Sequence, residues 1–377
     1  MSDSANTVAP ATPVTAQPIA NAHVTRFEPL TSPRDLKAEQ PLSAAAEATV
    51  TASRASVERI VNKQDPRLLL IVGPCSIHDE AQALDYAGRL AALRTQYADR
   101  LEIVMRVYMD KPRTTVGWRG YLNDPHMDGK NDFNLGLSKT RRLMLKINEL
   151  GMPVGTELLD PFVPQYIDDQ LSWAAIGART TESQTHRAMV SGISTPVGFK
   201  NGTGGNIKLA VDAIVSSGKP HTFLGITDEG QAAVVSTKGN PDGHVILRGG
   251  RFGPNYAAEH VQETLGLLAD AGVTAGIVVD CSHHNSSYQF EKQLGAWHDV
   301  IAQRVAGNDA LVGLMLESNL IEGKQSIPAD PAELKYGVSV TDACVGWQTT
   351  EELLKWAYDQ MGAVMGQPAP EQEAVKS

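Results

Sequence analysis

The feature that most constrains the fold of this chain is a regular alternation of short apolar segments with longer amphipathic ones. Each apolar segment is rich in Val, Ile and Leu and is bounded by Gly, Pro or polar residues. In chain order they are Leu68–Gly73, Leu101–Val107, Pro153–Leu158, Ala174–Ala178, Pro196–Lys200, His244–Arg248, Ala275–Asp280 and Ala310–Met315. Helical patterns, such as residues 79–100 and 256–270, lie between them. Short apolar runs separated by helices are typical of buried parallel strands.

Eight strands, each followed by a helix, is the number found in a closed (β/α)8 barrel. An open doubly wound sheet is the alternative, because the local pattern of the two folds is the same. We predict an α/β protein, a TIM barrel over residues 67–365. Residues 222–227 and 232–237, separated by DEGQ, predict a β-hairpin inserted between strands five and six. Residues 319–341 form a connection after strand eight that is long enough to suggest a function.

The segments outside the predicted barrel differ from it in composition. Residues 1–25 are rich in Pro, Ala and Thr and contain no Lys or Arg. This composition predicts a disordered tail, and it lacks the basic residues of a secretory or transit peptide. Residues 26–66 form an N-terminal extension in which we expect a helix around Ala44–Val61. Residues 366–377 are expected to be a flexible C-terminal tail.

Charge and cysteine content narrow the function. The chain has 33 Lys and Arg against 43 Asp and Glu, a net charge of −10, which argues against nucleic acid as a partner. It has no apolar run approaching the ~18 residues of a membrane span, so we expect no membrane partner. The three cysteines, Cys75, Cys281 and Cys344, have no metal-finger spacing. Few cysteines indicate a reducing compartment, and we expect a cytoplasmic protein.

Charged or metal-binding residue types occur where the predicted strands end. In order they are Cys75, Arg106, Glu157, Arg179, Lys200, Arg248, Asp280 with His283, and Glu317. In a barrel these residues meet at the carboxyl-terminal mouth. One charged residue at a strand end is usually a solvated cap, but four cations around one mouth repel each other unless anions lie among them. The KPRTT loop adds Lys111, Arg113 and two threonines, enough for two phosphates and a carboxylate.

A second grouping suggests a metal site. Cys75, His283, Glu317 and Asp342 supply a thiolate, an imidazole and two carboxylates. Mixed S, N and O ligation suits a divalent ion such as Mn, Fe, Co or Zn. Their wide spacing leaves structural interpretations open, since Cys75 could be a buried apolar residue, His283 a satisfied barrel histidine and Asp342 a helix cap.

These residues lie in segments that resemble 3-deoxy-D-arabino-heptulosonate 7-phosphate (DAHP) synthase, in its short, feedback-regulated bacterial and fungal form. The similarity covers residues 55–362. The segments are GPCSIHD (73–79), MRVYMDKPRTTVGW (105–118), GARTTESQ (177–184), VGFKNGTGG (197–205), HVILRGG (244–250), DCSHHNS (280–286), ESNLIEG (317–323) and YGVSVTDAC (336–344). The chain departs from the usual pattern at Gly204, His284 and Met109–Asp110, none of which is an expected ligand.

The resemblance implies a transferase that condenses phosphoenolpyruvate with erythrose 4-phosphate and water, the first step of aromatic amino-acid synthesis. It implies that Cys75, His283, Glu317 and Asp342 bind the metal ion. The residues implied for phosphoenolpyruvate are Arg106, Lys111, Gly177, Ala178, Arg179, Lys200 and Arg248, with Glu157 nearby. Lys111, Pro112, Arg113 and Thr114 would hold erythrose 4-phosphate. Lys111 is our candidate proton donor, and Glu157 and His283 are both candidates for the base that activates water.

The resemblance also implies feedback inhibition by an aromatic amino acid, Tyr or Phe rather than Trp. The matching positions are Pro164, Gln165, Ser194, Phe223 and Val235. Residues 26–45 would then pack on a neighbouring subunit of a dimer or tetramer. Two other functions stay open: a related synthase that uses a five-carbon aldose phosphate, and a catalytically silent sensor of aromatic amino acids.

Overall fold

The computed structural model describes residues 19–113 and 115–366. Thr114 and most of the two predicted tails (residues 1–18 and 367–377) lie outside the described residues. The chain divides into two compact units, Met1–Leu30 and Thr31–Ser377. Within residues 19–30 the Val24 amide donates to the Asn21 carbonyl at 3.0 Å, closing a turn, and this described stretch contains no helix or strand.

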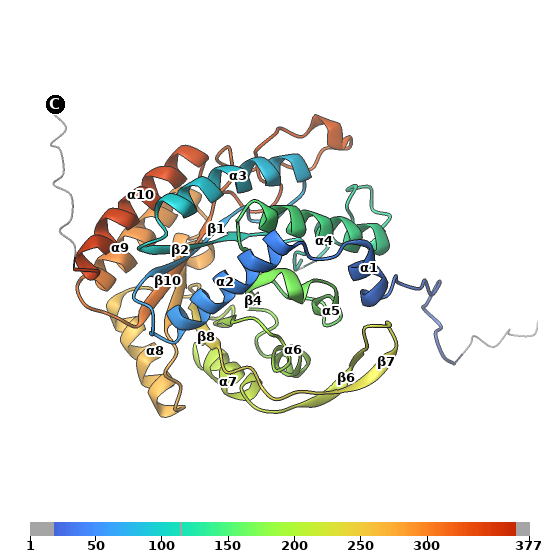
Figure 1. Ribbon diagram of the computed structural model, residues 1–377, viewed down its shortest axis with the longest axis horizontal. Coiled ribbons are helices and arrows are strands. Elements are labelled where there is room, and N and C mark those ends of the chain that lie inside the picture. Colours follow the sequence, from blue (N-terminus) through green and yellow to red (C-terminus); the bar gives the residue numbers. More distant parts are fainter. Residues whose placement is uncertain (1–18, 114, 367–377) are drawn as a thin grey trace, which may run out of the picture. The chain divides into compact units, whose positions relative to one another are not determined.

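The second unit is built on parallel strands that close into a barrel (Figure 1). Around the barrel the order is β1, β10, β9, β8, β5, β4, β3 and β2, so each strand lies beside its neighbours in the chain once the hairpin is set aside. The strands are β1 (Leu68–Gly73), β2 (Leu101–Arg106), β3 (Val154–Glu157), β4 (Leu171–Ile176), β5 (Val197–Lys200), β8 (Gly243–Leu247), β9 (Ile277–Asp280) and β10 (Leu311–Glu317). The predicted (β/α)8 barrel is therefore confirmed, and the open sheet is excluded.

Helices surround the barrel and begin at residues that satisfy their first amides. Ser43, Asp79, Asp132 and Ser183 each accept a hydrogen bond from an amide of the first turn. The helices are α1 (Pro33–Glu39), α2 (Ala44–Val61), α3 (Glu80–Gln96), α4 (Phe133–Glu149), α5 (Pro164–Ile167), α6 (Gln184–Val190), α7 (Lys208–Ser217), α8 (Ala258–Asp270), α9 (Gln293–Val305) and α10 (Trp347–Val364). The helix expected around Ala44–Val61 is α2.

Most predicted strands match the observed ones to within two residues at each end, but strand four is wrong. We predicted Ala174–Ala178, whereas β4 begins at Leu171 and ends at Ile176. The reason is Ser172, a polar residue that breaks the apolar run although it is fully buried. The predicted hairpin is confirmed as β6 (Thr222–Ile226) paired antiparallel with β7 (Ala232–Ser236). None of the described helices is long and apolar enough to span a bilayer.

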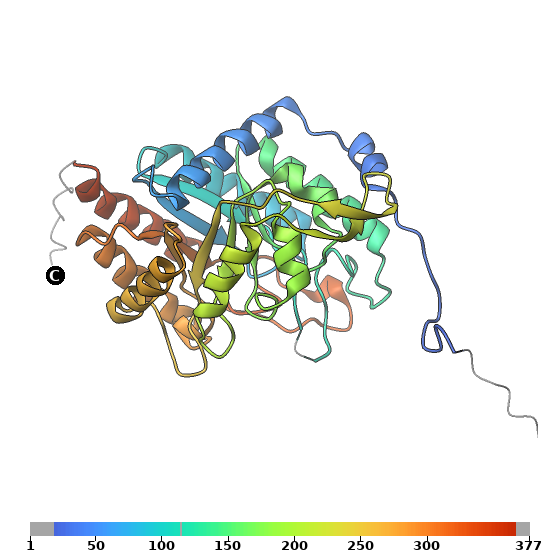
Figure 2. The same cartoon turned by 90° about the horizontal axis from the view of Figure 1, so that it is seen from below.

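Helix α2 closes the amino-terminal end of the barrel. Its residues Val57 and Ile60 are fully buried and pack in one cluster with Leu69 and Ile71, which point into the barrel. Its last carbonyl, on Val61, accepts from the Gly276 amide at 2.7 Å. Figure 2 shows α2 on one side of the barrel and the long loops that follow the strands on the opposite side. Apolar packing thus seals this end of the barrel, and the long loops that follow the strands surround the opposite, carboxyl-terminal mouth.

Helix α1 connects the N-terminal extension to the inserted hairpin of the same chain. Leu36 of α1 is buried in the main core. Arg34 forms an ion pair with Glu229 in the hairpin turn, and its amide donates to the Asp228 carbonyl at 2.8 Å. Arg141 of α4 donates to the Gln40 carbonyl at 3.0 Å and pairs with Asp169 at 2.7 Å. The extension is thus fixed to α4 and to the tip of the hairpin.

A neutral histidine lies inside the barrel. His244 of β8 is fully buried; its Nε2 accepts from Trp173 Nε1 at 3.1 Å, and its Nδ1 lies 3.3 Å from the Asp242 carbonyl. This pair of contacts fits the tautomer that carries its proton on Nδ1. Burial lowers the pKa of His244 from 6.5 to about 4.

We predict that His244 makes the fold sensitive to acid. Between pH 6.5 and 4 the unfolded chain binds a proton at His244 that the native state does not. The free energy of unfolding therefore decreases as the pH is lowered through this range. The loss from pH 7 to pH 5 should be about 2 kcal/mol. Urea unfolding at the two pH values should show this loss in the wild type and a loss smaller by that amount in His244→Gln. Equal losses would contradict the prediction, whatever the absolute stability of the variant.

Candidate active site

The carboxyl-terminal mouth contains a cavity of about 630 Å³. Its wall includes most of the residues that we predicted to bind anions. These are Lys111, Pro112, Arg113, Glu157, Gly177, Ala178, Arg179, Lys200 and Arg248, together with His283 and Asp342. Lys200 and Arg248 are buried, whereas Arg113 and Arg179 are exposed at the rim. Residues from six strand ends thus line one cavity, as closure of the barrel requires.

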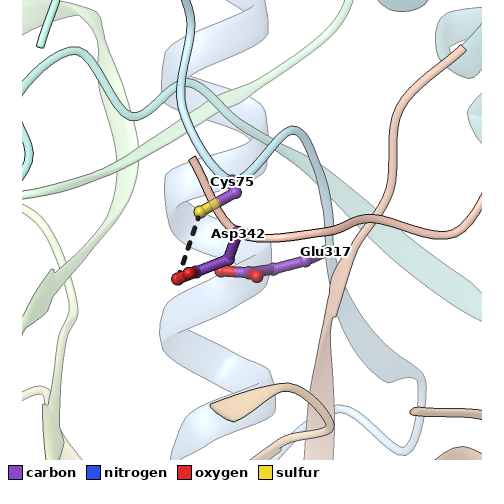
Figure 3. Close-up of side chains that lie close together, drawn as sticks. All are labelled: Cys75, Glu317 and Asp342. Carbon is purple, nitrogen blue, oxygen red and sulfur yellow. Dashed lines mark hydrogen bonds between the residues drawn. The ribbon is translucent and has the colours of Figure 1, made fainter. Parts of the chain in front are cut away.

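Three of the four predicted metal ligands form one group. Cys75, Glu317 and Asp342 place a ligand atom each within 4.8 Å of one another (Figure 3). The Cys75 thiol lies 3.7 Å from Asp342 Oδ2. His283 is not part of this group, although its ring lines the same cavity as Asp342. The donor set of one sulfur and two carboxylates fits a divalent ion of intermediate softness.

Charges around the group control its protonation. Burial raises the pKa of the Cys75 thiol to about 11, and Glu317 adds to the effect. Burial alone would lower the pKa of Lys111, but Cys75, Glu317 and Glu157 raise it above its usual range. Lys111 Nζ lies 3.3 Å from Cys75 Sγ and donates to the Cys75 carbonyl at 3.0 Å. The site therefore holds a protonated lysine against a thiol that a bound cation would deprotonate.

Arg106, which we predicted to hold phosphoenolpyruvate, is not among the residues that line the cavity. Its guanidinium is fully buried and donates to Glu317 Oε1 at 3.1 Å, and it lies 4.0 Å from the centre of the Tyr108 ring. Gly73, the last residue of β1, has a φ of +151°, which glycine can adopt, and a Cβ there would meet the Arg106 backbone. Arg106 thus compensates the charge of Glu317 beneath the group.

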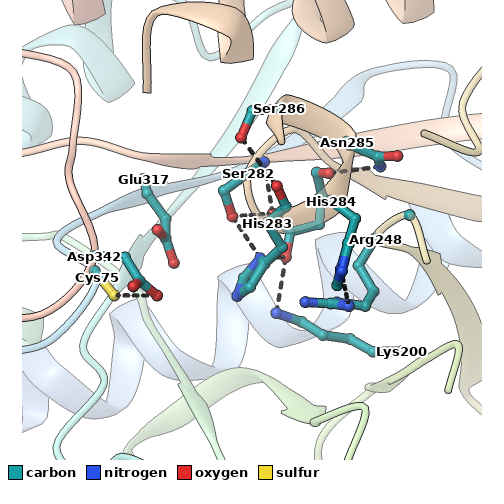
Figure 4. A network of polar contacts seen from close by, with 12 residues as sticks. Cys75, Lys200, Arg248, Ser282, His283, His284, Asn285, Ser286, Glu317 and Asp342 are labelled. Atoms are coloured by element: carbon teal, nitrogen blue, oxygen red, sulfur yellow. Dashed lines mark hydrogen bonds and ion pairs between the residues drawn. The ribbon is translucent and has the colours of Figure 1, made fainter. Parts of the chain in front are cut away.

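Figure 4 shows a second set of polar contacts beside this group, formed around His283 and the cavity cations. His283 lies between Cys75, Glu317 and Asp342 on one side and Lys200 with Arg248 on the other. Arg248 contacts His284 Nδ1 at 2.8 Å and donates to the Tyr288 hydroxyl at 3.3 Å. Sequence reasoning missed the parts of His284 and Tyr288, because neither stands at a strand end; the unusual histidine at 284 was the one available signal.

Glu157 and Gly177 fit each other closely. Glu157 ends β3 and is 9% exposed, and Gly177 follows β4. A Cβ at Gly177 would collide with Glu157 Oε1. The absence of a side chain at Gly177 therefore leaves room for the Glu157 carboxylate in the cavity wall. The position of Gly177 in the sequence did not reveal this role.

The loop that carries Lys111 and Arg113 is closed by its own backbone. The Lys111 amide donates to the Arg119 carbonyl at 2.8 Å, and the Leu122 amide donates to the Met109 carbonyl at 2.9 Å. Asp110 accepts from Asn123 Nδ2 at 2.8 Å, and burial raises the pKa of Asp110 to about 6. The predicted ligand Thr114 lies outside the described residues.

A separate pocket of about 370 Å³ lies between the hairpin and α5. Four of the five predicted regulatory residues line it, namely Pro164, Gln165, Phe223 and Val235. Ser194 does not; it is exposed, and its amide donates to Asp168 Oδ2 at 3.4 Å. The hydroxyls of Ser191 and Thr237, which lie 2.5 Å apart, also line this pocket.

The fold and the mouth define a class of protein. A barrel that gathers cations, carboxylates and a thiol at its strand ends is an enzyme scaffold for small anionic substrates with a candidate metal site. Residues 42–355 match the model of the DAHP synthetase I family. The chain belongs to this family.

Individual relatives agree with the family. The chain is 51% identical over 335 residues to the Tyr-sensitive phospho-2-dehydro-3-deoxyheptonate aldolase of Escherichia coli K12, covering 89% of this chain and 94% of the relative. It is also 51% identical over 332 residues to the Phe-sensitive form from the same organism, covering 88% and 94%. The solved structure of the aldolase from Francisella tularensis SCHU S4 superimposes with a TM-score of 0.88 at 41% identity, covering 90% of this chain and 99% of that one.

We predict that Cys75 is needed for metal binding and that the other buried cysteines are not. Cobalt bound by a thiolate shows a sulfur-to-metal charge-transfer band in the near ultraviolet. Titration of the metal-free protein with Co²⁺ should produce this band in the wild type and in Cys281→Ala, and should not produce it in Cys75→Ala. Cys281 is the matched control because it is equally buried. A band of full intensity in Cys75→Ala would remove the thiol from the ligand set.

Proposed function

We propose that this protein condenses phosphoenolpyruvate with erythrose 4-phosphate and water to give DAHP and inorganic phosphate. In the reaction C3 of phosphoenolpyruvate forms a bond to the aldehyde carbon, water adds at C2, and the C2–O bond to phosphate breaks. The observation that carries the proposal is the cavity of Lys111, Arg179, Lys200 and Arg248 beside the Cys75–Glu317–Asp342 group. Family membership supports the same reaction.

The buried cations suit phosphoenolpyruvate. Lys200 and Arg248 are buried and line the cavity, where they can form charge-assisted hydrogen bonds to phosphate and carboxylate oxygens. Arg179 and the backbone of Gly177 and Ala178 complete this side of the cavity. We assign Arg106 an indirect part, since it pairs with Glu317 and does not line the cavity. Together these groups would hold C3 against the aldehyde, which is a positioning effect.

The KPRTT loop suits the aldose phosphate. Pro112 and Arg113 stand toward the rim of the cavity, and Arg113 can pair with a terminal phosphate in forked geometry. Lys111 lies between the two halves, and its raised pKa keeps it protonated at neutral pH. It can therefore give a proton to the oxygen that becomes the new hydroxyl. Glu157 and His283 both line the cavity and were the two candidates to take the proton from the attacking water; Glu157 is favoured, because a metal-bound His283 has no free lone pair.

Cys75, Glu317 and Asp342, joined by His283, would hold one divalent ion, for which Mn, Fe, Co and Zn are the candidates. When bound, such an ion acts as a Lewis acid toward the aldehyde oxygen, where negative charge develops. A related synthase for a five-carbon aldose phosphate is the second candidate function, because it would use the same phosphoenolpyruvate half. A silent sensor is disfavoured by the complete set of cations and candidate ligands in one cavity.

We predict that substitutions at the rim separate the two substrates. Arg179→Ala should raise the KM for phosphoenolpyruvate about 10- to 100-fold, because it removes charge-assisted hydrogen bonds of roughly 1.5–3 kcal/mol. Arg113→Ala should raise the KM for erythrose 4-phosphate by a similar factor. Phosphate release measured against each substrate tests both, with Arg251→Ala, an exposed arginine outside the cavity wall, as the control. Equal effects of both variants on both substrates would show that the partition is wrong. Faster turnover with a five-carbon aldose phosphate would favour the second function.

We also propose that the pocket between α5 and the hairpin binds an inhibitory aromatic amino acid. Phe223 and Val235 offer apolar contact, and Gln165 offers hydrogen bonds to the amino-acid backbone groups. The Ser191 and Thr237 hydroxyls can accept a bond from a tyrosine hydroxyl, which supports Tyr over Phe, with Trp the least suited. Inhibition then requires that the ligand bind active and inactive states with different affinity, since the pocket and the cavity share no residues.

We also propose that the N-terminal extension takes part in inhibition by contacting a neighbouring subunit of the same protein. Because α1 packs on its own chain, the contact with a neighbouring subunit is proposed for the residues that precede it. These residues would help to close the pocket of the neighbour in a dimer or tetramer. The proposed setting remains the cytoplasm.

We predict that Phe223→Ala weakens inhibition about tenfold or more, since it removes apolar area from the ligand, while uninhibited turnover is retained. Phosphate release titrated with Tyr, Phe and Trp gives the inhibition constants. Leu224→Ala is the matched control, because Leu224 is the next residue on β6, is 83% exposed and does not line the pocket.

Deletion of residues 1–30, which spares α1, should weaken inhibition in the same way. It should also reduce the number of subunits in the oligomer, measured from the molar mass in solution. A truncated enzyme with full sensitivity would remove the N-terminal part of the proposal. Equal inhibition constants for Phe223→Ala and the wild type would contradict the proposal that the inhibitor binds in this pocket.

A further inference from the structure

Asp280 was expected at the mouth of the barrel but was given no role there, and it contacts both halves of the site. It is the last residue of β9 and is fully buried. Its Oδ2 accepts from Lys200 Nζ at 2.8 Å and lies 3.0 Å from His283 Nδ1. Its Oδ1 accepts from the Ser282 amide at 3.1 Å and from the Ser282 hydroxyl at 2.7 Å. One carboxylate therefore holds a cation of the anion-binding cavity and the histidine beside the metal group.

The two nitrogens of His283 have different surroundings. Nδ1 faces Asp280 and also lies 2.6 Å from the Ser282 hydroxyl. Nε2 makes no hydrogen bond within the described part of the chain, and the ring lines both the main cavity and a smaller one that Glu317 and Asp342 share. A carboxylate that accepts from Nδ1–H fixes the tautomer whose Nε2 lone pair is available to a metal ion.

The backbone at His283 supports a fixed orientation. Its φ is +57°, a left-handed conformation that a non-glycine residue adopts only when its surroundings hold it. Asn285 donates to the Asp280 carbonyl at 2.8 Å and to the Leu247 carbonyl at 3.1 Å, which closes this turn onto the ends of β9 and β8.

We propose that Asp280 is a positioning residue that presents His283 Nε2 to the Cys75–Glu317–Asp342 group and at the same time fixes Lys200 in the cavity. The proposal rests on the proposed function, in which these residues bind a divalent ion. Removal of this carboxylate would leave Lys200 and His283 without their shared partner.

The test is metal affinity in Asp280→Asn, measured by competition of Co²⁺ between the purified protein and a chelating indicator dye. Loss of an outer partner of a ligating histidine should weaken Co²⁺ binding about 10- to 100-fold. The charge-transfer band of Cys75 should persist, because the thiol is not touched. Glu102→Gln is the matched control: Glu102 is also a buried carboxylate of the barrel, paired with Arg67 and Arg94 at the other end of a strand. It should lower stability and leave Co²⁺ affinity unchanged.

Folded Asp280→Asn with wild-type affinity for Co²⁺ would overturn the inference while leaving the ligand set intact. Absence of the charge-transfer band in the wild type would instead contradict the proposed set of metal ligands, and the inference about Asp280 would fail with it. If Asp280→Asn does not fold, ¹⁵N-histidine NMR of the wild type decides, with His283→Gln used to assign the signal. The inference requires His283 to carry its proton on Nδ1 in the metal-free protein, and a proton on Nε2 would refute it.

Discussion

The pairing of buried cations with buried carboxylates at the strand ends is the interaction on which the mouth of this barrel depends. Arg106 with Glu317 and Lys200 with Asp280 are ion pairs whose side chains are at most 4% exposed. A single buried charge would be strongly unfavourable, so each member requires the other. Arg106 of β2 and Glu317 of β10 lie on either side of β1, so this pair depends on the β1–β10 pairing that closes the barrel. Lys200 of β5 and Asp280 of β9 meet across β8.

This arrangement leaves a surplus of cations facing the cavity and a surplus of carboxylates facing the candidate metal group. Lys111 stands between the two, in contact with Cys75 and in the cavity wall. A substrate that carries phosphate and carboxylate groups would balance the first surplus, and a divalent ion would balance the second. The charges that would bind the anionic substrate and the divalent ion are thus already in place without either ligand. Such preorganisation favours the positioning of two reactants.

The pocket proposed for regulation and the cavity proposed for catalysis lie in different parts of the same chain. The amino-terminal end of the barrel is closed by α2, and the hairpin stands outside the barrel with its own pocket. Arg141 and α1 connect that pocket region to the N-terminal extension through Gln40, Asp169 and the hairpin turn. Two distinct cavities on one rigid scaffold are the structural requirement for an inhibitor that does not compete by occupying the active site.

The sequence by itself determined the order and number of the barrel strands, the hairpin and the residues that gather at the mouth. These follow from local pattern, because apolar runs, helical periodicity and the residue after each strand can be read in order along the chain. Strand four was misplaced because Ser172, although buried, does not look like a core residue.

Only the tertiary structure decided how the gathered residues pair. Arg106 pairs with Glu317, Ser194 is not among the residues that line the pocket, and Asp280 joins Lys200 to His283. The partners in these contacts lie up to 211 residues apart in the chain. The choice of partner depends on side-chain directions and on which charge is buried beside which, and both are set only when the strands close into the barrel.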